Sequence, residues 1–102
     1  MAIYRLAAGA VTTSTTQNAV TVGTGNTATI ANCVLCNNSS SAIDIDVAIN
    51  NVLITTVSLR GGIGRSAIAY EAIGGLNSGD KLQFTGDGGA YNYYVAGNTN
   101  KT

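Results

Sequence analysis

A strict alternation between Ile43 and Asn50 constrains the fold more than any other feature of the chain. Apolar side chains recur there at every second position: Ile43, Ile45, Val47 and Ile49. A period of two places them on one face of a β-strand, because a helix needs a spacing of three to four residues. We therefore expect a half-buried strand here. The longer segment Thr27–Asn50 is predicted to be a hairpin whose two strands are joined by a polar Asn-Ser turn.

The rest of the chain consists of short apolar and β-branched segments separated by glycine and asparagine turns. Further strands are expected over 2–7, 11–16, 19–22, 52–59, 81–85 and 90–96. Residues 66–73 fit a helical turn and a strand equally well, and residues 74–80 are expected to form a loop. The pattern predicts an all-β fold, an antiparallel β-sandwich or small jelly roll of about seven to eight strands.

The length of 102 residues predicts a single β-sandwich domain over 1–102. Residues 1–11 are expected to form an N-terminal arm or an edge strand, and residues 98–102 a flexible polar tail. The hydrophobic content of 45% argues against disorder. The short apolar run at the N-terminus does not fit a secretory signal, and no run is long enough to span a membrane.

Charged residues are scarce, with five acidic against five basic side chains, or 10% of the chain. Such a chain has no strong field to attract nucleic acid or an anionic membrane, so neither is expected as a partner. The charged content is well below the roughly 25% of an ordinary soluble domain. A surface this poor in charge is weakly protected against association, which suggests that much of it meets another protein.

The sequence offers no catalytic constellation, and we expect no enzyme activity and no cofactor. Histidine is absent, which removes the commonest general base and a common metal ligand. A serine nucleophile would need another base, but Lys81 and Lys101 lie in a strand and in the expected tail. The glycine-rich segment 61–66 lacks the spacing and the lysine of a phosphate-binding loop.

Asp44 and Asp46 lie on one face of the predicted strand, roughly 7 Å apart. Two carboxylates at this distance could hold Ca²⁺ or act as an acid/base pair, but a calcium site needs six to eight oxygen ligands. A solvated face or an intersubunit contact is the favoured interpretation, and no metal site is predicted. Arg60 and Arg65 are the candidate counter-charges, in a loop expected to contact a partner.

Three tyrosines gather in the last predicted strand, where Tyr91 and Tyr93 share one face and Tyr94 points to the other. Such a cluster could stack on bases or sugars. With little positive charge nearby, core packing combined with interface contact is the favoured interpretation.

The two cysteines, Cys33 and Cys36, are three residues apart in a predicted strand. Their Cα atoms would lie roughly 10 Å apart, beyond the approximate 7 Å limit for a disulfide, and their side chains would point to opposite faces. A bond within the chain is therefore not expected. Two interpretations stay open: inert core thiols, or an interchain bridge that joins Cys33 of one chain to Cys36 of another.

The whole chain resembles the small β-sandwich structural proteins of tailed bacteriophages. The resemblance is carried by the opening A-I-Y-R-L-A-A-G-A-V, by the segment T-A-T-I-A-N-C-V-L-C-N-N-S-S-S-A-I-D-I-D-V-A-I, and by L-N-S-G-D-K-L-Q-F. Among these proteins it is most similar to capsid decoration, or cement, proteins. Minor tail and fibre or whisker proteins with a receptor- or glycan-binding role are the alternative.

The resemblance implies a protein made in the host cytoplasm and placed on the capsid surface of the virion. There it would bind the major capsid protein and stabilise the shell by bridging capsomers. It also implies a homo-oligomer, either a disulfide-linked dimer or a trimer, in which segment 2–11 pairs with a neighbouring chain. The expected capsid or subunit contacts are Ile3, Tyr4, Arg5, Arg60, Arg65, Tyr91, Tyr93 and Tyr94.

Overall fold

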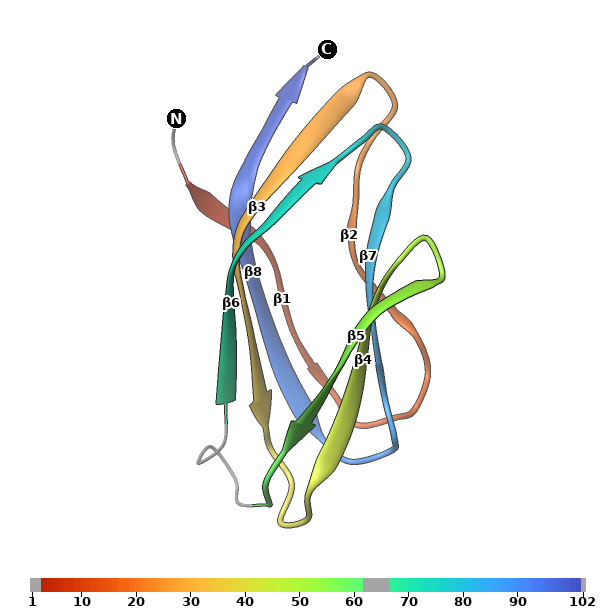
Figure 1. Ribbon diagram of the computed structural model, residues 1–102, viewed down its shortest axis with the longest axis vertical. Coiled ribbons are helices and arrows are strands. Elements are labelled where there is room, and N and C mark those ends of the chain that lie inside the picture. Colours follow the sequence, from red (N-terminus) through yellow and green to blue (C-terminus); the bar gives the residue numbers. More distant parts are fainter. Residues whose placement is uncertain (1–2, 62–66, 102) are drawn as a thin grey trace.

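The computed structural model describes residues 3–61 and 67–101, which form eight β-strands in two four-stranded antiparallel sheets (Figure 1). The strands are β1 (Tyr4–Val11), β2 (Gln17–Thr21), β3 (Asn26–Asn37), β4 (Ile43–Ile49), β5 (Val52–Leu59), β6 (Ala67–Leu76), β7 (Lys81–Gly86) and β8 (Tyr91–Lys101). The first sheet has the order β1-β8-β3-β6, and the second has the order β2-β7-β4-β5. Within the described ranges, no helix is long and apolar enough to cross a membrane.

The topology is that of one long hairpin rolled up into two sheets. The first strand pairs with the last, β2 with β7, β3 with β6 and β4 with β5, while β3–β8 and β4–β7 pairs complete the sheets. Strands that follow one another in the sequence therefore lie in opposite sheets, except for β4 and β5. This is the arrangement of a jelly roll. The prediction of an all-β sandwich or small jelly roll is confirmed.

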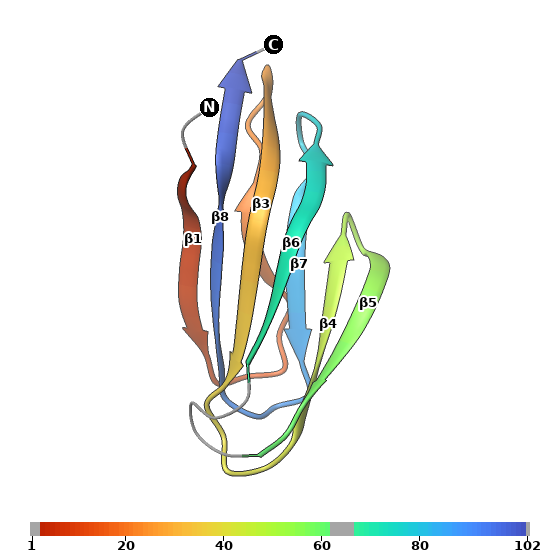
Figure 2. The same cartoon turned by 60° about the vertical axis from the view of Figure 1, so that its left-hand side comes forward.

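The prediction of a hairpin over Thr27–Asn50 is wrong, although both of its strands exist. The strand β3 lies in the first sheet and β4 in the second, so the polar segment between them crosses from one layer to the other (Figure 2). Both strands have an apolar face that needs the core, and placing one in each sheet buries both faces against each other.

The one connection between consecutive strands of the same sheet is the turn between β4 and β5. Asn50 and Asn51 have φ angles of 51° and 65°, and Ile49 pairs directly with Val52. Two central residues with positive φ are typical of a type I′ turn, which asparagine tolerates better than most residues. The asparagine turn expected between the strands at 43–50 and 52–59 is therefore confirmed.

The core lies between the two sheets and contains the inward residues of both. Its fully buried side chains include Ile30, Cys33, Leu35, Ile45, Leu76, Leu82, Phe84, Tyr91 and Val95. The rings of Phe84 in the second sheet and Tyr93 in the first join the layers, with centroids 5.2 Å apart and planes tilted by 53°. Aromatic pairs in this geometry add to the energy of area burial.

Several predicted boundaries change in the structure. Of the two forms expected for the N-terminal segment, an arm or an edge strand, the structure shows an edge strand, β1, that pairs with β8 of its own chain. Residues 12–16 connect strands instead of forming one, and the ambiguous segment 66–73 falls largely in the strand β6. The tail predicted over 98–102 is instead strand as far as Lys101, because its backbone pairs with the start of β3.

Candidate functional site

The structure distributes the predicted contact residues over separate places. Tyr91 is fully buried, Tyr93 is half-buried on the inner face, and Tyr94 is exposed on the outer face of the first sheet. The two faces predicted for these tyrosines are therefore present, but only one ring is available to a partner.

The remaining predicted contacts lie on other elements. Ile3, Tyr4 and Arg5 are exposed at the start of β1, where the Tyr4 hydroxyl lies 2.6 Å from that of Thr99 and holds the strand to β8. Arg60 is exposed after β5, and Arg65 lies outside the described residues. Apart from Arg65, the predicted contacts thus divide between a sheet edge, a sheet face, a loop and the core.

Both cysteines are free thiols on opposite faces of β3. Cys33 is fully buried, and its burial raises the pKa of the thiol to about 12. A bridge from Cys33 to another chain would require the two sheets to separate. Cys36 is half-buried on the outer face, so it is the thiol that another chain can reach.

Asp44 and Asp46 point to solvent from the outer face of the second sheet. Each carboxylate accepts a hydrogen bond from the residue opposite it on β5: Ser58 Oγ at 2.7 Å and Thr56 Oγ1 at 2.8 Å. Within the described part of the chain, no group of three or more histidine, cysteine or acidic side chains could hold a metal ion. The pair therefore serves as cross-strand hydrogen-bond acceptors in this structure.

A residue that the sequence did not single out, Asn37, fixes the crossing between the sheets. Its side chain is fully buried and donates hydrogen bonds to the carbonyl oxygens of Ser41 at 2.9 Å and Arg60 at 2.6 Å. Its own oxygen accepts a bond of 2.7 Å from the backbone N–H of Ser39. These contacts close the polar turn after β3 and attach it to the end of β5.

Among the side chains that the structure describes, the most exposed large apolar ones form a continuous run at the tip of the β4–β5 hairpin. Val52, Leu53 and Ile54 are 62%, 58% and 57% exposed, respectively. Ile54 lies at a register shift in the β4–β5 pairing, so the edge strand is irregular at this point. The hairpin tip stands away from the first sheet (Figure 2), which leaves these side chains without a core to enter. We call this run the apolar tip.

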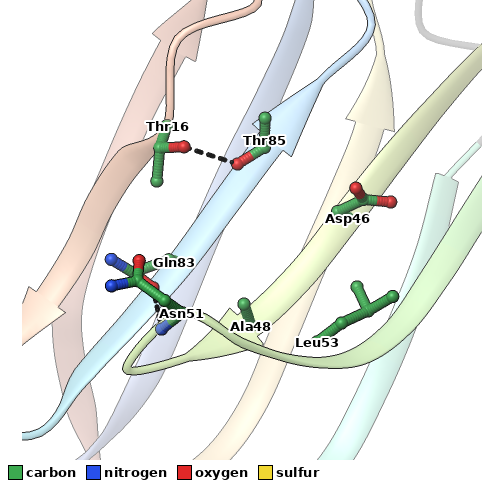
Figure 3. A pocket seen from close by; sticks show the side chains of 7 residues that line it. All are labelled: Thr16, Asp46, Ala48, Asn51, Leu53, Gln83 and Thr85. Atoms are coloured by element: carbon green, nitrogen blue, oxygen red, sulfur yellow. Dashed lines mark hydrogen bonds between the residues drawn. The ribbon is translucent and has the colours of Figure 1, made fainter.

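A shallow depression of about 220 Å³ lies beside the apolar tip on the outer face of the second sheet (Figure 3). It is lined by Thr16, Asp46, Ala48, Asn51, Leu53, Gln83 and Thr85. Gln83 is held in place, because it accepts a bond of 2.8 Å from the Asn51 N–H and donates one of 2.9 Å to Asn18. The depression therefore has a fixed polar lining with one apolar wall.

The outer face of the first sheet differs in character from that of the second. Cross-strand neighbours share a face, so the register identifies three outward rows across β1, β8 and β3. The rows are Arg5, Ala96 and Asn32; Ala8, Tyr94 and Val34; and Ala10, Asn92 and Cys36. We call this surface the alanine–tyrosine face. Outward positions on the second sheet include Asp44, Asp46, Thr56, Ser58, Gln83 and Thr85, together with the apolar Ala48 and Leu53.

No protein-family model and no curated protein sequence matches the chain. Among solved structures, it is similar to the nucleoplasmin-like N-terminal domain of Drosophila FKBP39, with a TM-score of 0.58 and 9% identity over 98% of this chain and 90% of that chain. The Drosophila NLP-core gives a TM-score of 0.52 and 18% identity, with 99% of this chain and 100% of that chain covered.

A third similar structure is the catalytic domain of Agl-KA, with a TM-score of 0.54 and 15% identity. The match covers 93% of this chain but only 27% of that chain, so it corresponds to one part of a larger protein. At these identities, the three likenesses establish the β-sandwich fold alone.

Proposed function

We propose that this chain is a tailed-phage virion protein that decorates the outer surface of the capsid shell, with the major capsid protein as its partner. In this role it stabilises the shell by bridging neighbouring capsomers and performs no chemistry. The observation that carries the proposal is the apolar tip, where three consecutive large side chains are each more than half exposed.

The apolar tip has no structural role that would explain its composition. The inward positions of β5 are already filled by Val57 and Leu59, which are 3% and 5% exposed. Full burial of a Val, Leu or Ile side chain is worth about 1.5–3 kcal/mol, so covering three half-exposed ones contributes several kcal/mol. A partner surface supplies that gain without any change in the sandwich.

Three further observations support a non-catalytic assembly role. The sequence resembles phage decoration proteins over its whole length, and its 10% charged content leaves little electrostatic protection against association. The Drosophila NLP-core, whose structure was described for pentamer formation and histone binding, has a similar fold. In that protein the fold is combined with self-assembly and partner binding, which supports an assembly role here.

Co-sedimentation with purified capsid shells of the encoding phage tests the proposal. We expect the wild-type chain to pellet with shells and Leu53→Glu to remain largely in the supernatant, because the variant places a charge in the interface. Thr21→Glu is the matched control, since it introduces the same charge at an exposed position of the edge strand β2, opposite Lys81.

Circular dichroism and thermal unfolding of both variants separate a binding defect from a folding defect. Because Leu53 and Thr21 are exposed, both substitutions should leave stability nearly unchanged. Equal pelleting of Leu53→Glu and the wild type, with the control also bound, would exclude the apolar tip as the capsid contact.

A second candidate function, glycan binding on a tail or whisker, is favoured by the depression beside the tip. Carboxylate, amide and hydroxyl groups that hydrogen-bond sugar hydroxyls line it next to the apolar wall of Leu53 and Ala48. Titration with bacterial surface polysaccharide, observed by NMR, tests this candidate. Saturable shifts at Thr85 and Gln83 that disappear in Asp46→Asn would favour it over decoration, and the absence of shifts would reject it.

A further inference from the structure

One edge of the second sheet is formed by β5, which pairs with β4 on one side and with no described strand on the other. Figure 2 shows β5 as the outermost strand of its sheet. An edge strand presents backbone N–H and C=O groups with which another chain can pair, so natural proteins protect their edges with charged side chains, proline, β-bulges or short strands. The protection of each edge therefore distinguishes a closed edge from one that can accept a further strand.

The described sandwich has four edge strands, β1, β6, β2 and β5, and each of them contains a register shift. Three of the four have further protection, because β1 contains Arg5, β6 contains Glu71, and β2 is only five residues long. The strand β5 has the sequence V-L-I-T-T-V-S-L, without a charged residue, a proline or a glycine. Most of its residues are β-branched, a composition that favours strands. Among the four edges, β5 is therefore the one with the least protection.

The register identifies the backbone groups of β5 that point outward. Residues along β4 direct their backbone groups alternately to its two neighbours, β7 and β5. Asn50, which follows β4, donates its backbone N–H to the Lys81 carbonyl of β7 at 3.1 Å, and this bond sets the phase of the alternation. The β5 residues opposite the β7-directed positions are Leu53, Thr56 and Ser58. Their N–H and C=O groups therefore point away from β4, to the open side of the sheet.

We propose that an extended segment of the major capsid protein adds to β5 as a fifth strand of the second sheet. This inference rests on the proposed capsid role and states how the shell is contacted. The outward groups of β5 are main-chain donors and acceptors in a row, which an extended polypeptide matches with its own main chain. Because β5 contains no charged side chain, the segment that fits beside it is itself uncharged and rich in β-branched residues.

The open edge and the apolar tip belong to the same strand, so one added segment covers both. Leu53 contributes its side chain to the tip and its backbone groups to the edge. The side chains of Thr56 and Ser58 already bond the carboxylates of β4, so pairing of their backbone groups disturbs no existing contact. Main-chain hydrogen bonds then hold the segment, and the exposed apolar side chains select its sequence.

A second copy of β5 matches this edge less well than a foreign segment. The regular part of β5 lies beyond the register shift at Ile54 and offers Thr56 and Ser58. If these two residues paired antiparallel with their counterparts in a second copy, Leu53 would lie opposite Gly61, beyond the end of the strand. Both apolar tips would then stay uncovered. A segment of another protein is not bound by this two-fold symmetry, so it can cover the tip as well.

Binding of a proline variant to purified capsid shells tests the proposal. Thr56→Pro removes an outward N–H and places the proline ring at the open edge, while the neighbouring residues keep their bonds to β4. Thr56→Val is the matched control, because it loses the same side-chain bond to Asp46 but keeps the backbone N–H. We expect Thr56→Val to bind shells like the wild type and Thr56→Pro to bind at least tenfold more weakly, with circular dichroism showing that both are folded.

The outcomes separate this inference from the capsid role on which it rests. Equal binding of the folded Thr56→Pro variant, Thr56→Val and the wild type would overturn strand addition and leave capsid decoration standing. A wild type that does not bind shells would overturn both.

Hydrogen exchange of the wild-type chain provides a second measurement that needs no variant. The outward N–H groups of Leu53, Thr56 and Ser58 should exchange rapidly in the free chain and at least tenfold more slowly on shells, as measured by mass spectrometry after quenching. The amides of the opposite edge strand β2 should exchange equally in both states. Unchanged exchange of the β5 amides in the bound chain would overturn the proposal. Protection that arises in the free chain as its concentration rises would assign the edge to a second copy instead, and would overturn it too.

Discussion

Asn37 is the residue through which the crossing between the two sheets is held. Its buried amide hydrogen-bonds the backbone at Ser39, Ser41 and Arg60, which joins the end of β3 to the end of β5. Buried polar groups are costly unless paired, and this side chain pairs three backbone groups at once. One side-chain amide therefore links the end of β3 in the first sheet to Arg60, which follows β5 in the second sheet and lies 23 positions further along the chain.

Removing this amide should strongly destabilise the fold. We expect Asn37→Ala to lower the free energy of unfolding by about 3 kcal/mol, since three part-buried hydrogen bonds are lost and each contributes about 1 kcal/mol. Its neighbour Asn38 is exposed and bonds Ala90 through its backbone, so Asn38→Ala should change stability by less than about 0.5 kcal/mol. Urea unfolding measures both, and equal losses would show that Asn37 has no special role.

Two buried groups at the residue scale predict a loss of stability in alkali. Burial raises the pKa of Cys33 from 9.0 to about 12, and burial together with Tyr93 raises that of Tyr91 from 10.0 to about 12. The unfolded chain releases these protons first, so stability is complete below about pH 9 and decreases as the pH approaches 12.

The expected slope is at most about 1.4 kcal/mol per pH unit for each group once the unfolded chain has deprotonated. Tyr91→Phe should reduce the slope above pH 10. It should also raise stability at neutral pH by about 1 kcal/mol, because the buried Tyr91 hydroxyl has no hydrogen-bond partner in the described structure. Urea unfolding at pH 7 to 11 checks both effects. If the unfolding free energies of Tyr91→Phe and the wild type fell with the same slope above pH 10, the linkage would be contradicted.

At the scale of elements, the sequence predicted strands better than it predicted their partners. Alternation located β4 because Ile43, Ile45 and Val47 on one face of that strand are buried. It could not distinguish a hairpin from a crossing, since both join two half-buried strands through a polar turn. The crossing depends on Asn37 and on the carbonyl of Arg60, a contact between distant parts of the chain that local sequence does not show.

The same limit applies to the candidate site. The sequence predicts Val52, Leu53 and Ile54 as part of an ordinary strand. It does not indicate their exposure, because consecutive apolar residues fit a buried strand as well as an exposed one. Their exposure follows from the position of the hairpin tip relative to the first sheet, which only the fold defines (Figure 2). For the tyrosine strand, the predicted core packing is present, because the inward rings of Tyr91 and Tyr93 lie in the core or against it, and Tyr94 is the exposed ring.

The turn between β4 and β5 gives a prediction at this scale. Asn51→Gly should raise the free energy of unfolding by a few tenths to about 1 kcal/mol, because glycine adopts the positive φ of this type I′ position without strain. The backbone N–H that bonds Gln83 is kept in the variant. Asn51→Ala, which also keeps that bond, should lower stability instead. A loss in the glycine variant would indicate that the Asn51 side chain has a role of its own.

The whole molecule presents two different outer surfaces and a projecting tip. Both sheets carry polar side chains outward, Asp44, Asp46, Thr56 and Ser58 on the second sheet and Arg5, Asn32 and Asn92 on the first, where they lie among Ala8, Val34, Cys36 and Tyr94. With five charges of each sign, the chain has little electrostatic repulsion to limit its association. The projecting tip fits a protein that binds another surface through the edge of its second sheet.

The stoichiometry of binding to tailless capsid shells tests the proposed role most directly. Purified chain should bind isolated shells saturably, in a copy number that follows the number of capsomers, and should raise the temperature at which the shells disrupt. Binding to complete virions only, through their tails, would contradict the account, as would the absence of binding to either particle.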